Sequence, residues 1–466
     1  MGGNTSKVPN TIKNLKDFEC DLFRIGLGEM QGWRDNMEDA SLIHIAKNHS
    51  KIVKTYKEQL DLSKSFKNPF KLTEENTKEK EKKNEKQKDN KRNSNFSFNS
   101  QKSNKSSKKS LEDYFHENKK LEEGEVELSI NSQDETEESS INLILKEMRI
   151  SNEEIRKKIT RELEDKCPEN NISMIGVFDG HGGSFVSRLV AENFITMFRN
   201  SWIKYIIKND MGNFRELTKD SSKSNNLKLY NRKMLEQILL QTFLDFDEVF
   251  YNKKCQEIVN EYKTFRRDDL VIKNLPQLLT EDLDMNIHQL NFAHFMGTTA
   301  NLICLYDNNL LISNIGDSIS VLYADGKAVF LNTEHKVTVP GEEERIKKSG
   351  KTIINGRVDG KLNLTRAIGD LQFKNKRDKP HEQAVTVYPE FNFVELDDTC
   401  EFVVTACDGI WDCVEPQKLC EFISLELKKG KEISEIISYI EDMVISKTNN
   451  SPIGTDNMTC IIMQFK

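Results

Sequence analysis

The chain has 466 residues, of which 36% are hydrophobic and 31% are charged, with a formal net charge of −7. A mean hydropathy of −0.63 is low for a chain that packs throughout its length, so part of it must lie outside any core. Acidic and basic residues are both abundant, so we expect no nucleic-acid partner. Nine cysteines occur singly, without C-x-x-C spacing, which excludes a disulfide framework and fits a reducing compartment. No apolar run approaches the length of a membrane span.

The N-terminal segment, residues 1–21, carries a lipidation pattern. Gly2 follows the initiator methionine and a hydroxyl side chain stands at Ser6, which predicts myristoylation of Gly2. A single acyl chain binds a membrane only marginally, so stable anchoring needs a second signal. A thin basic group close by is opposed by Asp17 and Glu19; it consists of Lys7, Lys13 and Lys16. We therefore expect a cytoplasmic protein with a membrane-associated fraction.

Residues 54–168 differ in composition from the rest of the chain. Lys, Glu, Asn and Ser dominate and hydrophobic periodicity fails, which predicts a disordered insertion. Residues 78–109 are basic with interleaved serines, and residues 112–138 are acidic. One hypothesis is a regulatory arm that touches anionic lipid and is released by phosphorylation; the other is a solvated low-complexity insert. Apolar residues at helical spacing over 141–159 predict a short amphipathic helix.

The remaining sequence mixes strands and helices. Apolar, β-rich runs occur at residues 23–30, 41–46, 172–178, 299–306, 310–315, 319–323, 402–407 and 458–465. Helical periodicity occurs at residues 184–198, 235–250, 342–348 and 416–428. Short turns join many of the strands, which favours an α+β fold with antiparallel sheets flanked by helices. A second insertion is expected at residues 251–292.

Carboxylates recur at the ends of the apolar strands. Asp179 lies in the segment FDGHGG after one strand, Asp317 and Asp408 follow two others, and Asp456 immediately precedes the last. A single such residue is usually a turn former or a helix cap. Four together, if the sheets bring them to one rim, make an all-oxygen site that is stable only around hard cations. Mg²⁺ or Mn²⁺ fits this ligand set better than zinc.

A guanidinium lies near these carboxylates in the segment GWRDNMEDA. Arg34 could hold a phosphate through two hydrogen bonds, or could form a structural salt bridge with Glu38, four residues later. Asp39 follows Glu38 at the end of the same segment. The residues alone leave both interpretations of Arg34 open.

Taken in order, GWRDNMEDA, VFDGHGG, MGTTAN, NIGDS, LTRAIGD, ACDGIWD and GTDNMTC closely resemble the metal-dependent Ser/Thr protein phosphatases of type 2C. The resemblance runs from about residue 23 to residue 465, which places the phosphatase domain at residues 22–466, interrupted by the two insertions. It implies a four-layer α-β-β-α sandwich of two antiparallel sheets. It also implies hydrolysis of phosphoserine and phosphothreonine in proteins, with attack by a water that bridges two Mg²⁺ or Mn²⁺ ions.

The resemblance also implies a role for each matching residue. Asp179 would bridge two metal ions, with the Gly180 carbonyl on one of them and with Asp408 and Asp456 on the second. Glu38 and Asp39 would act through bound waters, and Asp317 would help Asp408 hold a third, weaker ion. Arg34 would bind the substrate phosphate, and His181 would protonate the departing Ser or Thr oxygen. Thr298 and Asn457 would hold the metal-binding residues in place without contacting the ions themselves.

Small departures from the family pattern affect substrate preference more than chemistry. Thr365 stands where the family usually has Ser, and Val337 stands where it usually has Pro. Other phosphatase chemistries fit poorly, because no cysteine is followed by Arg six positions later and the Asp282-x-Asp284 pair follows no apolar strand. A different class of function is a catalytically silent, membrane-associated scaffold, which we would expect to have lost its metal ligands.

Overall fold

The computed structural model describes residues 5–47, 49, 168–209, 231–251 and 292–466. The helix expected at 141–159 lies outside the described residues. So do the two expected insertions, apart from residue 168 of the first and residues 251 and 292 of the second.

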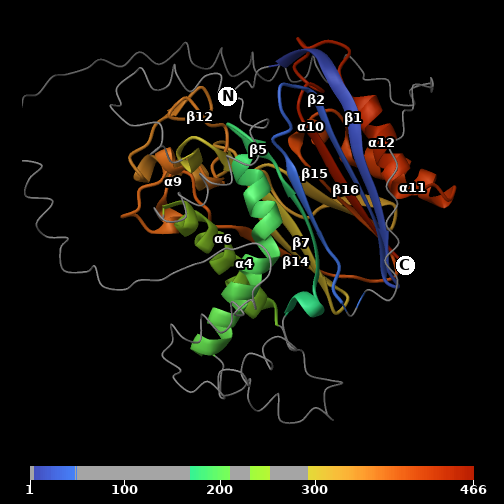
Figure 1. Cartoon of the computed structure of the whole chain (residues 1–466), viewed down its shortest axis with the longest axis horizontal. Coiled ribbons are helices and arrows are strands. Elements are labelled where there is room, and N and C mark those ends of the chain that lie inside the picture. The colour runs from blue at the N-terminus through green and yellow to red at the C-terminus, as the bar shows by residue number, and fades with distance from the viewer. Residues whose placement is uncertain (1–4, 48, 50–167, 210–230, 252–291) are drawn as a thin grey trace, which may run out of the picture. The chain divides into compact units, whose positions relative to one another are not determined.

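The first large sheet contains six strands, and every neighbouring pair is antiparallel. Their order is β1 (Thr5–Glu19), β2 (Phe23–Arg34), β16 (Met458–Phe465), β15 (Cys400–Ala406), β9 (Ile319–Ala324) and β10 (Lys327–Phe330). Figure 1 shows β2 beside β16, so strands from near the two ends of the chain are neighbours in this sheet.

The second large sheet contains five antiparallel strands. Their order is β14 (Glu390–Glu395), β8 (Asn309–Ile315), β7 (Ala300–Tyr306), β4 (Ser173–Phe178) and β3 (Ala40–His44). Strands β4 and β7 are buried along their whole length. Burial on both faces is expected of central strands packed between a second sheet and a layer of helices.

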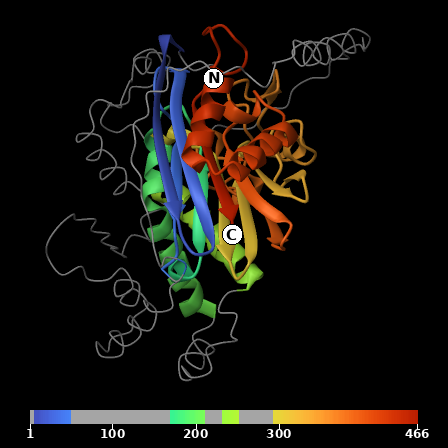
Figure 2. The ribbon, with the colours of Figure 1, turned by 90° about the vertical axis from the view of Figure 1, so that its right-hand side faces the viewer.

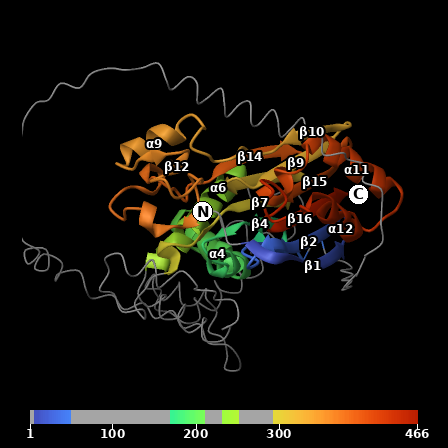
Figure 3. The same cartoon turned by 90° about the horizontal axis from the view of Figure 1, so that it is seen from above.

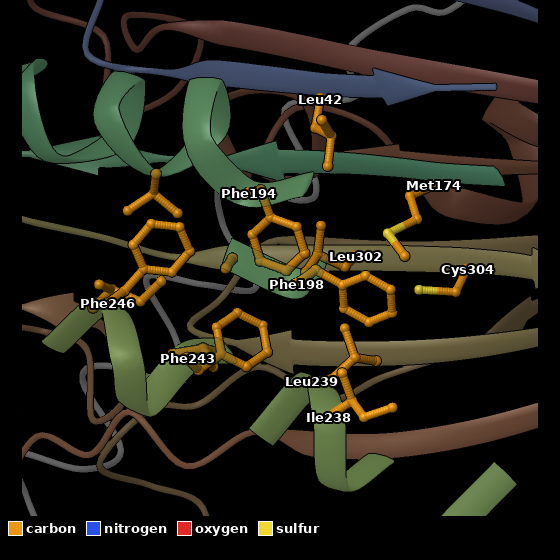
Figure 4. Close-up of a cluster of buried hydrophobic side chains, with 14 of the residues drawn as sticks. Leu42, Met174, Phe194, Phe198, Ile238, Leu239, Phe243, Phe246, Leu302 and Cys304 are labelled. Atoms are coloured by element: carbon orange, nitrogen blue, oxygen red, sulfur yellow. The ribbon is translucent and has the colours of Figure 1, made fainter. Parts of the chain in front are cut away.

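Two helical layers cover the outer faces of the sheets. Helices α11 (Pro416–Lys428) and α12 (Ile433–Val444) pack on the six-stranded sheet, and Figure 2 views the protein from their side. Helices α4 (Phe185–Asn209) and α6 (Arg232–Tyr251) pack on the five-stranded sheet. Figure 4 shows phenylalanines from α4 and α6 meeting side chains of β4 and β7 in this outer core.

A third core fills the space between the sheets, with alternate residues of β2 facing alternate residues of β4. Ile25 and Leu27 pack with Ile175 and Val177, and all four are buried. The order helix, sheet, sheet, helix, which Figure 3 shows from above, confirms the expected α+β sandwich. Burial of apolar surface at three interfaces is its main source of stability.

Smaller elements lie beside the sheets. A three-stranded sheet contains β13 (Ile368–Gly369), β6 (Gly297–Thr298) and β5 (Gly180–His181), and a two-stranded sheet contains β11 (Ile353–Ile354) and β12 (Arg357–Val358). The short helices are η1 (Pro168–Asn170), η5 (Phe292–His294), α9 (Glu342–Lys348), η6 (Leu371–Phe373), η7 (Pro380–Glu382) and α10 (Asp408–Trp411). Residues between β10 and β14 share a core of their own around Ile346 and Val385.

Two elements extend the sequence-based assignment. Residues 5–19, which the sequence places in a separate N-terminal segment, form the edge strand β1 along β2. The pattern does not show it because only one face of an edge strand packs: Leu15 is 6% exposed, whereas Val8 and Ile12 are more than 70% exposed. Helix α12 was also missed, because its isoleucine-rich sequence is not typical of helices. None of the helices that the structure describes combines the length and the hydrophobicity of a membrane-spanning segment.

Candidate active site and metal centre

Three aspartates converge where strands from both sheets end. Asp179 follows β4, Asp317 follows β8 after a turn at Gly316, and Asp408 begins α10 with one intervening residue after β15 ends. One carboxylate oxygen from each lies within 4.8 Å of the others. The structure therefore brings together three of the four strand-end carboxylates that the sequence singles out.

The electrostatics of this cluster favour a bound cation. Burial raises the pKa of the Asp179 carboxyl well above its ordinary value, and the nearby Asp39, Asp408, Asp317 and Asp456 carboxylates raise it further. The pKa of Asp408 is also raised, first by burial and then by Asp317 and Asp456. Carboxylates held this close repel one another unless a positive charge lies among them. The donor set is all oxygen, which fits Mg²⁺ or Mn²⁺.

The backbone of Asp179 is fixed by the segment that begins β7. The Asp179 amide donates to Thr299 Oγ1 at 3.0 Å, and its carbonyl accepts from the Thr299 amide at 2.9 Å. Thr298 Oγ1 donates to the same carbonyl at 3.2 Å. Thr298 and Thr299 thus both contact the backbone of Asp179, and Thr299 is a contact that the sequence did not single out.

The GWRDNMEDA segment supplies two more acids behind the cluster. Asp39 is buried and accepts from Thr459 Oγ1 at 2.8 Å, and burial is the main cause that raises its pKa to about 7. Burial also raises the pKa of Glu38, although His181 and Arg34 partly offset this. The Glu38 amide donates to Asn457 Oδ1 at 2.8 Å, while Asn457 Nδ2 donates to the carbonyls of Gln31 and Asn36. Asn457 therefore ties this segment to the start of β16.

Arg34 forms its ion pair with Asp456 through Nη2 and Oδ2. Arg34 thus pairs with an aspartate from the other end of the chain and not with Glu38. Burial alone would lower the pKa of Arg34, but Asp456 and, to a smaller extent, Glu38 raise it. The Arg34 side chain is 23% exposed, so part of the guanidinium faces solvent at the rim. Asp456 lies near the cluster, because it raises the pKa of Asp179 and Asp408.

A lysine that sequence reasoning missed also enters the cluster. Lys336 Nζ forms an ion pair with Asp317 Oδ2, and this contact raises the lysine pKa against the opposing effect of burial. The neighbouring His335 accepts from the Gly316 amide at 3.1 Å and so supports the turn that carries Asp317. The signal for Lys336 in the sequence was weak, because it lies in a loop with no adjoining apolar strand.

His181 is held in the small three-stranded sheet. It pairs with Gly297 of β6, and its Nε2 lies 2.5 Å from Asp370 Oδ2. Burial alone would lower the pKa of His181, but the Asp370 carboxylate, with smaller contributions from Glu38 and Asp317, raises it. The sequence indicated His181 by its place after Asp179, but gave no sign that Asp370 was its partner.

A glycine allows the close approach of the segments that carry these groups. A Cβ on Gly180 would collide with the Glu38 carbonyl oxygen and would lie 2.7 Å from Ser187 Oγ. Ser187, near the start of α4, donates to that same carbonyl. Only glycine permits this approach between β5 and the GWRDNMEDA segment. The two segments that carry Asp179 and Glu38 are therefore packed directly on each other.

Comparisons with known proteins identify the family to which the chain belongs. The Protein phosphatase 2C family model matches residues 208–451, more than half of the chain. Probable protein phosphatase 2C 21 of Arabidopsis thaliana is 31% identical over 321 residues, covering 66% of this chain and 81% of that protein. Probable protein phosphatase 2C 11 of Oryza sativa is 42% identical over 171 residues, and there the match spans only 36% of this chain and 47% of the relative.

Among solved structures, the serine-threonine phosphatase 2C from Toxoplasma gondii is similar with a TM-score of 0.42 and 16% identity. That match covers 64% of this chain and 86% of the solved one. The family model and the Arabidopsis relative are sufficient for assignment: the chain belongs to the protein phosphatase 2C family, as a metal-dependent protein serine/threonine phosphatase.

Proposed function

We propose that the acidic cluster holds two divalent cations, Mg²⁺ or Mn²⁺, and that Asp179 bridges them. The Gly180 carbonyl would complete the first site, and Asp408 and Asp456 the second. Asp317 would share a third, weaker ion with Asp408, and Glu38 and Asp39 would act through waters. The grouping of Asp179, Asp317 and Asp408 within 4.8 Å is the observation that carries this proposal. When bound, such ions acidify a water for in-line attack and neutralise phosphate charge.

The chain's own groups then act on the phosphoserine or phosphothreonine. Arg34 binds the phosphate oxygens, because its guanidinium is partly exposed beside the cluster and can exchange Asp456 for a substrate anion. His181 gives a proton to the Ser or Thr oxygen as its bond to phosphorus breaks.

The alternative of a catalytically silent scaffold is not favoured, because the acidic cluster is retained. The test compares Asp179→Asn with Asp398→Asn, which alters an exposed aspartate far along the chain. We expect Asp179→Asn to lower hydrolysis of a phosphopeptide by at least about 100-fold, and to weaken Mn²⁺ binding in calorimetry. The control should retain both properties. Equal rates of phosphopeptide hydrolysis in the wild type and Asp179→Asn would refute the catalytic proposal.

Myristoylation of Gly2 and a membrane-associated fraction of an otherwise cytoplasmic protein form the second part of the proposal. The N-terminal sequence pattern supports both parts of this proposal. Lys13 is not available to lipid, because its Nζ binds Asp442 and the Ser438 carbonyl. A second membrane signal would therefore have to lie elsewhere.

Gly2→Ala tests this second part. We expect it to remove the acyl group from the intact mass of the protein and to move the membrane-associated fraction to the soluble fraction, without changing phosphopeptide hydrolysis in solution. Wild-type protein from its native source that shows no acyl mass would contradict the proposal.

A further inference from the structure

We propose that the buried ion pair between Asp247 and Lys374 is a positioning device for the reaction: it fixes the turn that carries Asp370, and through Asp370 it orients His181 toward the leaving oxygen. This inference rests on the proposed role of His181 as proton donor. Asp247 comes from α6 and Lys374 from the end of η6, so neither lies in the cluster of metal-binding candidates.

The small sheet brings His181 and Asp370 face to face. Gly297 of β6 pairs with His181 on one side and with Gly369 on the other, so residues 181 and 369 flank the same position. A Cβ on Gly297 would collide with Asp370 Oδ2 and would lie 2.7 Å from His181 Nε2. The absence of a side chain at Gly297 thus creates the space in which the carboxylate meets the imidazole.

The backbone at Asp370 must be held in place. Asp370 has φ 52° and ψ 40°, a left-handed conformation that costs a non-glycine residue free energy and persists only when the surroundings enforce it. Its side chain is buried, and the preceding Gly369 also has a positive φ. The carboxylate therefore points at His181 only while this turn keeps its shape.

Asp247 and Lys374 fix both sides of that turn. Asp247 Oδ1 accepts from the Gly369 amide at 2.9 Å, and its Oδ2 accepts from Lys374 Nζ at 2.5 Å. Lys374 Nζ also donates to the Ala367 carbonyl at 2.8 Å. The residues on each side of Asp370 are thus bound to one buried carboxylate and its lysine.

A buried pair of this kind is a poor choice for stability alone. Desolvation of both charges offsets much of their attraction, so an apolar pair of similar volume would often serve a fold as well. The Lys374 side chain is fully buried, and the Asp247 side chain nearly so. One residue further along α6, Glu248 pairs with Lys376 at 3.2 Å, and both are more than 60% exposed. This exposed pair links the same two segments without contacting the turn.

The contact with Asp370 also determines which ring nitrogen of His181 donates the proton to the leaving oxygen. Because Nε2 is held by Asp370, Nδ1 is the nitrogen that can serve the leaving oxygen. As the bond between phosphorus and the Ser or Thr oxygen breaks, that oxygen takes the Nδ1 proton. The neutral ring keeps its Nε2 proton in the bond to Asp370, so charge and protons balance across the step.

The experiment compares two substrates in the full-length protein with Mn²⁺. A phosphoserine peptide has an alkoxide leaving group that needs a proton, whereas p-nitrophenyl phosphate has one that does not. For Asp247→Asn we expect kcat on the peptide to fall by about 10- to 100-fold, and kcat on p-nitrophenyl phosphate by less than about 3-fold. Adding Asp247→Asn to His181→Gln should cost little further, because both changes act on one proton transfer.

Two variants complete the design. Glu248→Gln is the matched control from the exposed pair and should match the wild type on both substrates. Because Asp247→Asn leaves an unpaired buried lysine, the double variant Asp247→Asn with Lys374→Met provides a second test without that charge, and it should show the same substrate selectivity. Thermal unfolding of each variant verifies that the compared proteins are folded.

The outcomes test the proton-donor role of His181 and the positioning role of the ion pair separately. If His181→Gln lowers kcat equally on both substrates, the proton-donor role of His181 is refuted, and the positioning role of the ion pair is refuted with it. If His181→Gln lowers kcat only on the peptide, while the Asp247 variants lower kcat equally on both substrates, the positioning role of the ion pair alone is refuted. The same conclusion follows from losses that add fully in the variant that combines Asp247→Asn and His181→Gln.

Discussion

Glu441 should make the stability of the protein fall as pH rises. This residue of α12 is fully buried, and neither carboxylate oxygen has a hydrogen-bond partner among the residues that the structure describes. Burial raises the pKa of Glu441 well above its ordinary value of 4.5, with Lys13 opposing and Asp442 and Glu29 adding to the rise. Lys13 does not neutralise the carboxylate, because its Nζ is bound to Asp442 and Ser438. The protonated form of Glu441 is therefore favoured more in the folded protein than in the unfolded chain.

The expected magnitude follows from linkage between protonation and folding. Above the pKa of the unfolded chain and below that of the folded protein, only the folded state binds this proton. Glu441 then reduces the free energy of unfolding by about 1.4 kcal/mol for each unit of pH. The variant Glu441→Gln cannot ionise, so its stability relative to the wild type should improve at that rate as pH rises. An offset at low pH is expected, because the amide also lacks partners.

Urea unfolding from pH 5 to pH 8, at a fixed Mg²⁺ concentration, measures this difference. The groups that face Glu441 are Lys13 of β1, Glu29 of β2, Asp442 of α12 and Cys460 of β16, and all are unchanged in the variant. Glu435→Gln, an exposed change on the same helix, is the control and should show a difference that does not vary with pH. A constant difference for Glu441→Gln as well would refute the buried, protonated carboxyl.

Two further predictions concern the site. Gly409→Ala should lower the free energy of unfolding by about 1–3 kcal/mol in urea, because a Cβ there would collide with the Asn457 carbonyl oxygen; an unchanged midpoint would show that β16 can shift. Lys336→Met should strengthen Mn²⁺ binding in calorimetry roughly tenfold, since it removes a cation that competes for Asp317, with the exposed Lys347→Met as control. Weaker binding in Lys336→Met would instead make the lysine a support for the site.

The main strands and helices were predictable because the spacing of their apolar residues matches the face that each element buries against a neighbouring layer. Strand β16 and helices α9 and α11 were predicted with the bounds that the structure shows. The patterns of α11 and β16 are clear because one face of the helix, and nearly all of the strand, is buried. Strand β14 was missed, since it is an edge strand of mostly half-buried residues. Elements with few fully buried positions leave little hydrophobic pattern in the sequence.

The site was predictable to the extent that its residues lie at strand ends. An apolar run that stops at an aspartate indicates a carboxylate at a sheet edge, and Asp179, Asp317 and Asp408 do meet there. The partners of the other groups depend on contacts between distant segments. Arg34 finds Asp456 and His181 finds Asp370 only when the sheets have formed, so spacing along the chain could favour Glu38 but could not reveal either pair.

The positive charges in the structure indicate why the cluster needs cations from solution. Three carboxylates lie together, and burial and mutual repulsion raise the pKa of Asp179 and Asp408, which lowers stability as the carboxyls ionise at rising pH. Lys336 reaches only Asp317, and Arg34 is held by Asp456 at the rim. Neither side chain can contact all three carboxylates as a small divalent ion can. The fold therefore carries an electrostatic cost at this rim that ion binding relieves, so binding metal and stabilising the folded protein are the same event.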